Sequence, residues 1–278
     1  MKSRILILFL LPVLLVACNE TYAQRKKKKD PLADATLYIF NDDWSAAKTY
    51  NECTYFMQLT KESDSLYICH YYNKLGPMIR QEPYKDADFT IANGRFCWYN
   101  KSGSLDSTGW VSNNKKDHGW DYYQGGKRSL TMEYLNGRFV RTKDYQQEIF
   151  INADGTKTPF EDRKANDVIN KDSFTTIQVE AKFKNSVDDW TNYLKDNLKT
   201  PERLMNILGV GVHTAIVVFM IDKEGKIDKD IYLEKSVEWA GDNEVIALIQ
   251  NAPDWQPAYQ NNKAVFYRMK QSISFSVN

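Results

Sequence analysis

The chain has little of what catalytic and metal sites usually require. Only three histidines occur among its 278 residues, and none has the paired spacing of a metal ligand set. The sequence contains no G-x-S-x-G nucleophile motif and no P-loop, and residues 125–127 (Gly-Gly-Lys) are too short to cradle a phosphate. These absences argue against an enzyme, and the sequence predicts neither a metal nor a cofactor.

An excess of one charge and long apolar runs are also lacking. Lysine and arginine number 37 and aspartate and glutamate 36, so the net charge does not predict a nucleic-acid partner. The longest apolar run, Ile5 to Val16, is shorter than the roughly 20 residues that a membrane-spanning helix needs. A protein with several membrane-spanning helices is therefore excluded.

Cysteine is scarce, and its spacing does not predict a disulfide scaffold. The four cysteines show no metal-like spacing. A symmetric hairpin about a turn at residues 61–65 would place Cys69 opposite Met57 and Cys53 opposite Asn73, too far apart for a disulfide.

The N-terminus has the layout of a secretory signal, in which Lys2 and Arg4 precede the apolar run. Residues 15–18 (Leu-Val-Ala-Cys) resemble a bacterial lipobox, which favours removal of residues 1–17 and lipidation of Cys18. The alternative is cleavage after Ala23, which removes residues 1–23. Either outcome exports the chain, as a periplasmic lipoprotein of the outer or inner membrane or as a soluble periplasmic or secreted protein.

Residues 18–36 form a basic tether. The run from Arg25 to Lys29 could lie against anionic lipid headgroups, at roughly 1 kcal/mol for each cation. The alternative is a solvated tether that contacts nothing.

Residues 37–160 are rich in aromatic residues, in short runs separated by Gly, Asn, Asp and Lys, which predicts repeated strand-turn-strand units. Residues 71–76 recur as residues 98–103, and weaker copies lie at 122–126, 150–155 and 39–44. This pattern resembles MORN-type repeats. The resemblance implies stacked hairpins in an elongated antiparallel sheet, with a role in binding or spacing rather than chemistry.

Residues 161–182 are polar and without periodicity, which predicts a linker. After them, Ser186 and Asp189 are spaced as a capping box, and the helix that they begin is expected to end at Pro201. Strands are expected at residues 210–221 and 227–235.

A second helix is expected to follow Asp242 as its cap. The last strand, residues 265–277, alternates between apolar and polar side chains, so one of its faces should be buried. The predicted fold class is α+β: an N-terminal all-β repeat followed by a small α-β-β-α-β domain at residues 183–278.

Residues 183–277 resemble the C-terminal domain of the energy transducer TonB, by their element order and by a set of motif positions. These positions are expected to be structural: Pro201, Gly209, Gly211, Gly225, Ser236, Pro253, Trp255 and Pro257. The sequence departs from the family at Thr200 and at Gly241-Asp242.

The resemblance implies that the domain binds an extended peptide of an outer-membrane receptor, or another envelope protein, by adding it to a sheet edge. The expected edge is Val265, Tyr267, Arg268, Met269, Lys270, Gln271 and Ile273, although the two cations could serve only to protect the edge. The chain has neither a spanning helix nor a proline-rich spacer for energy coupling. The alternative is a passive lipoprotein whose aromatic sheet binds glycan or lipid, and the oligomeric state stays open.

Overall fold

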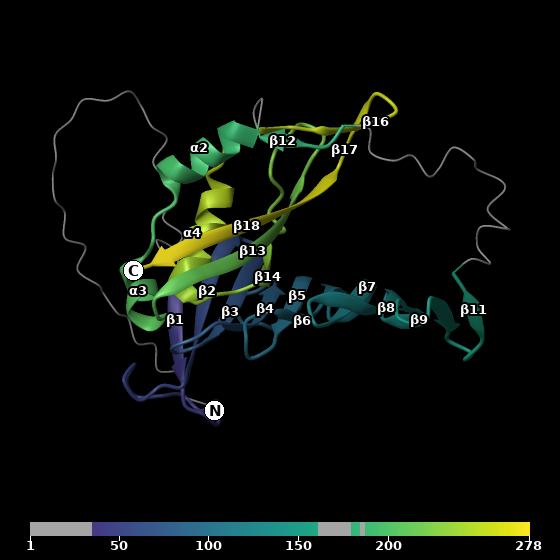
Figure 1. Cartoon of the computed structure of the whole chain (residues 1–278). Helices are drawn as coiled ribbons and strands as arrows, with labels where there is room; N and C mark the ends of the chain where they lie inside the picture. Colours follow the sequence, from purple (N-terminus) through teal and green to yellow (C-terminus); the bar gives the residue numbers. More distant parts are fainter. Residues whose placement is uncertain (1–34, 161–178, 184–186) are drawn as a thin grey trace.

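The computed structural model describes residues 35–160, 179–183 and 187–278, and strands predominate among them. Eleven strands form one antiparallel sheet in which each strand pairs with its neighbour in sequence (Figure 1). This confirms the prediction of an elongated all-β sheet. The strands are β1 (Ala35–Phe40), β2 (Tyr55–Ser63), β3 (Leu66–Asn73), β4 (Met78–Tyr84), β5 (Gly94–Tyr99), β6 (Leu105–Ser112), β7 (Lys115–Gln124), β8 (Lys127–Leu135), β9 (Arg138–Asp144), β10 (Ile149–Asn152) and β11 (Lys157–Pro159).

Two kinds of turn hold this sheet in register. Two-residue turns at 113–114, 125–126 and 136–137 have positive φ at both residues, the geometry that follows the twist of a hairpin and favours Asn and Gly. Five-residue turns use a different pattern, as at residues 100–104, where the Asn100 N–H donates to the Ser104 carbonyl and the Gly103 N–H to the Asn100 carbonyl. The Asn and Gly of the repeats therefore fix where each strand ends.

The β2–β3 hairpin corrects one predicted register. It turns at residues 64–65 beside a bulge, so Cys69 lies opposite Leu59, and the predicted pairing with Met57 was wrong by two residues. Cys53 precedes β2 and pairs with neither strand. The three cysteines of the described residues are buried and free.

The C-terminal part combines three helices with short sheets. Strands β14, β13 and β18 form a three-stranded sheet in that order, while β12 pairs with β15 and β16 with β17. The elements are β12 (Lys182–Phe183), α2 (Val187–Asn197), α3 (Glu202–Ile207), β13 (Gly211–Ile221), β14 (Tyr232–Lys235), α4 (Trp239–Gln250), β15 (Trp255–Gln256), β16 (Ala258–Gln260), β17 (Lys263–Val265) and β18 (Tyr267–Val277).

Several predicted boundaries shift. Helix α4 is capped by Glu238, whose carboxylate accepts the N–H groups of Ala240 and Gly241, so the predicted cap, Asp242, was wrong. Asp242 instead lies inside the helix and is fully buried. The helix begins earlier than predicted because Glu238, rather than Asp242, has the extended backbone that a cap position requires.

The helix predicted to reach Pro201 ends at Asn197, and Pro201 precedes the separate helix α3. Strand β14 begins at Tyr232, and Ile227 makes only an isolated bridge with Ile221. The predicted cap Ser186 and residues 161–178 of the predicted linker lie outside the described residues.

One hydrophobic core joins the two parts of the chain. Phe56 and Tyr72 of the large sheet belong to the same buried cluster as Phe219, Leu233 and Phe275 of the C-terminal part. In Figure 1 the C-terminal part lies over the first strands of the sheet, and β7–β11 extend beyond it. Among the described residues, no helix is long and apolar enough to cross a membrane.

Candidate peptide-binding edge

Strand β18 lies at the edge of the three-stranded sheet. It pairs with β13 over its whole length, from Gly211 opposite Val277 to Ile221 opposite Tyr267. No strand of the described residues pairs with its other side. Alternate N–H and C=O groups of β18 therefore face away from β13, which is the backbone pattern that an added strand recognises.

The two faces of β18 differ as predicted. Ile273, Phe275 and Val277 are buried in the core, whereas the serines between them are exposed. Tyr267, Met269 and Gln271 are half-buried on the core side of the strand. This confirms the predicted alternation. Because its core-side residues are fully buried, the C-terminal half of β18 is anchored more firmly than the N-terminal half.

Six of the seven predicted edge residues lie together in β18. They are Tyr267, Arg268, Met269, Lys270, Gln271 and Ile273. The seventh, Val265, belongs to β17 and pairs with Ala258 of β16. Phe266 separates the two strands and is exposed.

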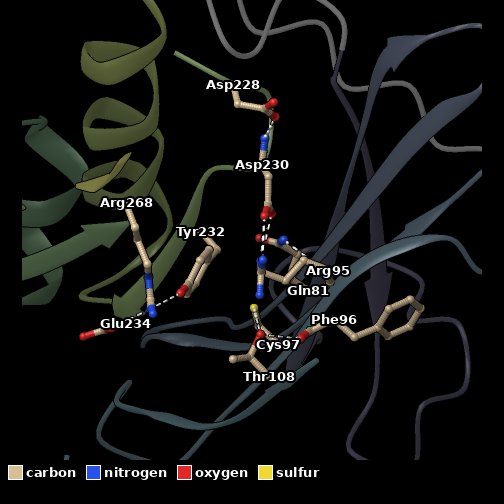
Figure 2. Close-up of polar contacts among 10 residues, drawn as sticks. All are labelled: Gln81, Arg95, Phe96, Cys97, Thr108, Asp228, Asp230, Tyr232, Glu234 and Arg268. Atoms are coloured by element: carbon tan, nitrogen blue, oxygen red, sulfur yellow. Dashed lines mark hydrogen bonds and ion pairs between the residues drawn. The ribbon is translucent and has the colours of Figure 1, made fainter. Parts of the chain in front are cut away.

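The basic residues of the edge strand share one carboxylate on β14. Figure 2 shows Arg268 reaching Tyr232 and Glu234, and its Nη2 lies 3.2 Å from Glu234 Oε1. Lys270 pairs with the other oxygen of Glu234. Both cations are about half exposed, so each pair contributes about 0–1 kcal/mol. Two cations against one carboxylate leave this face of the edge with a net positive charge.

Strand β14 is attached to the large sheet by an ion pair (Figure 2). The Arg95 guanidinium donates to both oxygens of Asp230, at 2.9 Å from Nε and 2.7 Å from Nη2, and lies 4.7 Å from the centre of the Tyr232 ring. Burial alone would lower the pKa of Arg95, but the hydrogen bonds and charge of Asp230 outweigh it and raise that pKa. The Tyr99 hydroxyl also donates to the Leu233 carbonyl at 2.9 Å.

A second buried polar cluster lies where α4 meets β3 and β4. The Ser236 hydroxyl accepts the Met78 N–H at 2.7 Å and donates to an Asp242 carboxylate oxygen at 2.5 Å. The other oxygen of Asp242 accepts the Val237 N–H at 2.9 Å. Burial raises the pKa of Asp242 to about 7, since hydrogen bonds only partly offset the desolvation of its charged form.

The remaining predicted motif residues have structural positions. A Cβ on Gly225, which has φ +84°, would lie 1.9 Å from the Trp255 carbonyl oxygen, so only glycine fits there. Trp255 is buried against Phe183, Trp190 and Phe219, as expected of a structural residue. Pro201, Gly209, Gly211, Pro253 and Pro257 lie at or between element ends. Cys18 and the basic run lie outside the described residues.

Sequence reasoning missed two partly buried ion pairs, one between the two parts of the chain and one within the C-terminal part. These are Arg95 with Asp230 and Arg203 with Glu238. The Arg95 pair joins residues 135 positions apart, and no spacing within one element points to either pair. Packing of the C-terminal part on the sheet brings Arg95 to Asp230, and packing within the C-terminal part brings Arg203 of α3 to Glu238, the cap residue of α4.

Comparisons with known proteins identify no relative: no family model, no curated protein and no solved structure matches the chain. Within the described ranges, no group of three or more His, Cys, Asp or Glu side chains is arranged to hold a metal ion.

Proposed function

We propose that the chain is an exported cell-envelope protein that binds an extended peptide of an outer-membrane receptor, or of another envelope protein, along the open side of β18. The observation that carries this proposal is the position of an eleven-residue strand at the edge of its sheet. Main-chain hydrogen bonds would supply affinity, and the alternating side chains would supply selectivity.

The resemblance to the TonB C-terminal domain supports the same reading. In the C-terminal part, helices α2 and α4 accompany a three-stranded sheet whose last strand in sequence is the edge strand. The MORN-like sheet would serve as the base on which this unit is mounted. By this resemblance the protein would act with TonB-type transport systems.

A rigid edge binds a peptide at a lower entropic cost than a mobile one. The β14 strand is tied to the large sheet through Arg95 and Asp230, and β18 is tied to β14 through Glu234. The edge is therefore supported through β13 and β14, on the side opposite its open one. This arrangement favours a binding role over a role as a passive stability module.

The test is capture of outer-membrane receptors by the purified protein and by two variants at one position. Lys270→Pro removes a backbone N–H and the charge, whereas Lys270→Ala removes only the charge. Strand addition predicts that the alanine variant captures the receptor and that the proline variant, shown to be folded by its circular dichroism spectrum, does not. Equal capture by both variants would contradict strand addition at β18.

The alternative is a passive lipoprotein whose aromatic sheet binds glycan or lipid. The observation that favours it is the cluster of aromatic rings on the large sheet, in which the Trp98 ring centre lies 5.8 Å from that of Phe96 and 5.4 Å from that of Trp120. Failure of the wild-type protein to capture any receptor would favour this alternative.

A further inference from the structure

One five-residue turn recurs in this chain, and its fourth position favours glycine. In the turns at 41–45, 100–104, 152–156 and 222–226, the first N–H donates to the fifth carbonyl and the fourth N–H donates to the first carbonyl. The fourth residue has φ between +64° and +84° in these four turns, whereas the turn at 73–77 has the same two hydrogen bonds with Gly76 outside the positive-φ region. Among the four, the fourth residue is glycine in three turns and tryptophan, Trp44, in the first. A side chain disfavours this left-handed backbone, and a bulky one such as tryptophan is uncommon there.

The Trp44 ring is supported from below by the sheet. It stacks on Tyr55, with ring centres 4.5 Å apart and planes 7° apart. The Arg80 guanidinium lies 4.8 Å from the Trp44 ring centre and 4.1 Å from that of Tyr71. Even so, 37% of Trp44 remains exposed. The residue is thus held in an unfavourable conformation without being used to fill the core, which is a pattern associated with ligand contact.

The groups around the Trp44 ring determine which kind of ligand would bind there. Asn41, Asp43 and Ser45 lie in the same turn, where the Asn41 amide donates to the Ser45 hydroxyl and that hydroxyl donates to Asp43 Oδ1. The exposed Asp43 carboxylate can accept further hydrogen bonds from hydroxyl groups of a ligand. The pKa of Asp43 is lowered by hydrogen bonds from Ser45, so this carboxylate stays charged at neutral pH.

The charges around Trp44 favour a neutral ligand over phosphate headgroups and nucleic acids. Among the described residues, the cation that lies over the Trp44 ring is Arg80, which is paired with Glu82 at 3.1 Å. Asp42 and Asp43, which precede Trp44 in the chain, are exposed and acidic. Phosphate headgroups and nucleic acids would therefore be repelled. The face of an aromatic ring is electron-rich and attracts the C–H groups on the face of a sugar ring.

We propose that Trp44, stacked on Tyr55 and flanked by Arg80, is a binding platform for a neutral sugar ring of an envelope glycan. The site is separate from the β18 edge and does not depend on peptide binding there. The tryptophan would be retained at a glycine position because its ring is the contact surface for the sugar.

The experiment measures binding of three neutral hexasaccharides, chitohexaose, cellohexaose and maltohexaose, to the purified full chain by saturation-transfer NMR and calorimetry. Trp44→Gly restores the residue that the turn favours and removes the ring. Phe266→Ala is the matched control, because Phe266 is another exposed ring, 55% exposed, on the other part of the chain. Vesicles containing phosphatidylglycerol test the anionic alternative.

We expect at least one hexasaccharide to bind and Trp44→Gly to weaken it by about tenfold or more, with Phe266→Ala unchanged. The midpoint of thermal unfolding should be the same or higher in Trp44→Gly, since the strain is removed. Three results would overturn the proposal: no binding of any hexasaccharide, binding that survives Trp44→Gly, or binding of the vesicles instead. A Trp44→Gly variant that fails to fold would also overturn it, because the ring would then be needed for the structure.

Discussion

The two halves of the eleven-stranded sheet share one sequence pattern but differ in what covers them. Strands β2–β6 lie under the C-terminal part and contribute Phe56, Tyr72 and Tyr99 to the main core. Strands β7–β11 extend beyond it (Figure 1), and their charged side chains pair near the surface, as Glu133 does with Arg141 and Lys143. The sequence repeats thus determine where the hairpins form, and burial under the C-terminal part determines which hairpins are the more stable.

The largest expected effect comes from breaking an ion pair of the C-terminal part, at the place where it contacts the covered half. Arg203 Nε lies 3.0 Å from Glu238, whose side chain is fully buried, and Arg203 also donates to the Tyr50 hydroxyl and the Lys74 carbonyl. Arg203→Ala leaves the Glu238 charge unpaired in the interior. The free energy of unfolding should fall by about 3–5 kcal/mol in urea titrations.

The matched control is the double variant Arg203→Met with Glu238→Gln, which removes both charges. It should lose clearly less stability than Arg203→Ala, because no buried charge is left without a partner. Equal losses in the two variants would show that packing of the Arg203 side chain, rather than its charge, supports the covered half.

Such pairs show where prediction from sequence reached its limit. Aromatic runs and Asn-Gly turns predicted the large antiparallel sheet, because hairpins depend on neighbours within about ten residues along the chain. The packing of Arg203 on Tyr50 and Phe56 joins segments about 150 residues apart, for which no local pattern exists. The cap of α4 was missed for a related reason: Asp242 has a cap-forming side chain, but it is drawn into the buried contact with Ser236.

The second effect concerns the pH dependence of stability. It separates two buried groups, His70 in β3 of the covered half and Asp242 in α4 of the part that covers it. The pKa of Asp242 is raised to about 7, so its contribution to stability is lost as pH rises from about 4 to 7. The pKa of His70 is lowered by burial to about 4, so its contribution is lost as pH falls from about 6.5 to 4. The two slopes have opposite signs and offset one another.

Single variants should reveal each slope in urea titrations at several pH values. Asp242→Asn should leave stability that rises with pH between 4.5 and 6.5, and His70→Gln should leave stability that falls, each changing by up to about 3–4 kcal/mol over the full interval. A slope of the same sign in both variants would show that another group dominates the titration.

A third comparison uses glycines of the same turn type in the two halves. A Cβ on Gly103 would lie 2.3 Å from the Ser236 carbonyl oxygen, whereas a Cβ on Gly155 has nothing within 4 Å. Both positions have positive φ, so Gly155→Ala should lower the free energy of unfolding by about 1–2 kcal/mol. Gly103→Ala should cost at least about 1 kcal/mol more, because it also forces the C-terminal part off the sheet. Thermal unfolding of the two variants side by side measures the difference.

The candidate edge strand β18 could be predicted from the sequence, but the residues that attach its neighbour β14 to the large sheet could not. Alternation along residues 267–277 predicted the faces of β18, because side-chain direction in a strand depends only on position. The attachment of β14 through Arg95 and Asp230 was not predictable, since Asp230 follows an irregular segment whose path depends on the packing of the large sheet. The site therefore combines a locally encoded strand with a support that only the assembled core provides.

The smallest effect should come from an ion pair in the uncovered half. Arg141 Nε lies 2.5 Å from Glu133 Oε2, as close as any ion pair of the covered half, but Glu133 is also paired with Lys143 and all three side chains keep some contact with water. Arg141→Ala should lower the free energy of unfolding by about 1 kcal/mol or less, because the remaining carboxylate is solvated and still has a cation beside it. Hydrogen exchange on β8 and β9 would detect the change locally. A loss as large as that of Arg203→Ala would mean that the two halves unfold as one unit and that the covering layer stabilises strands it does not touch.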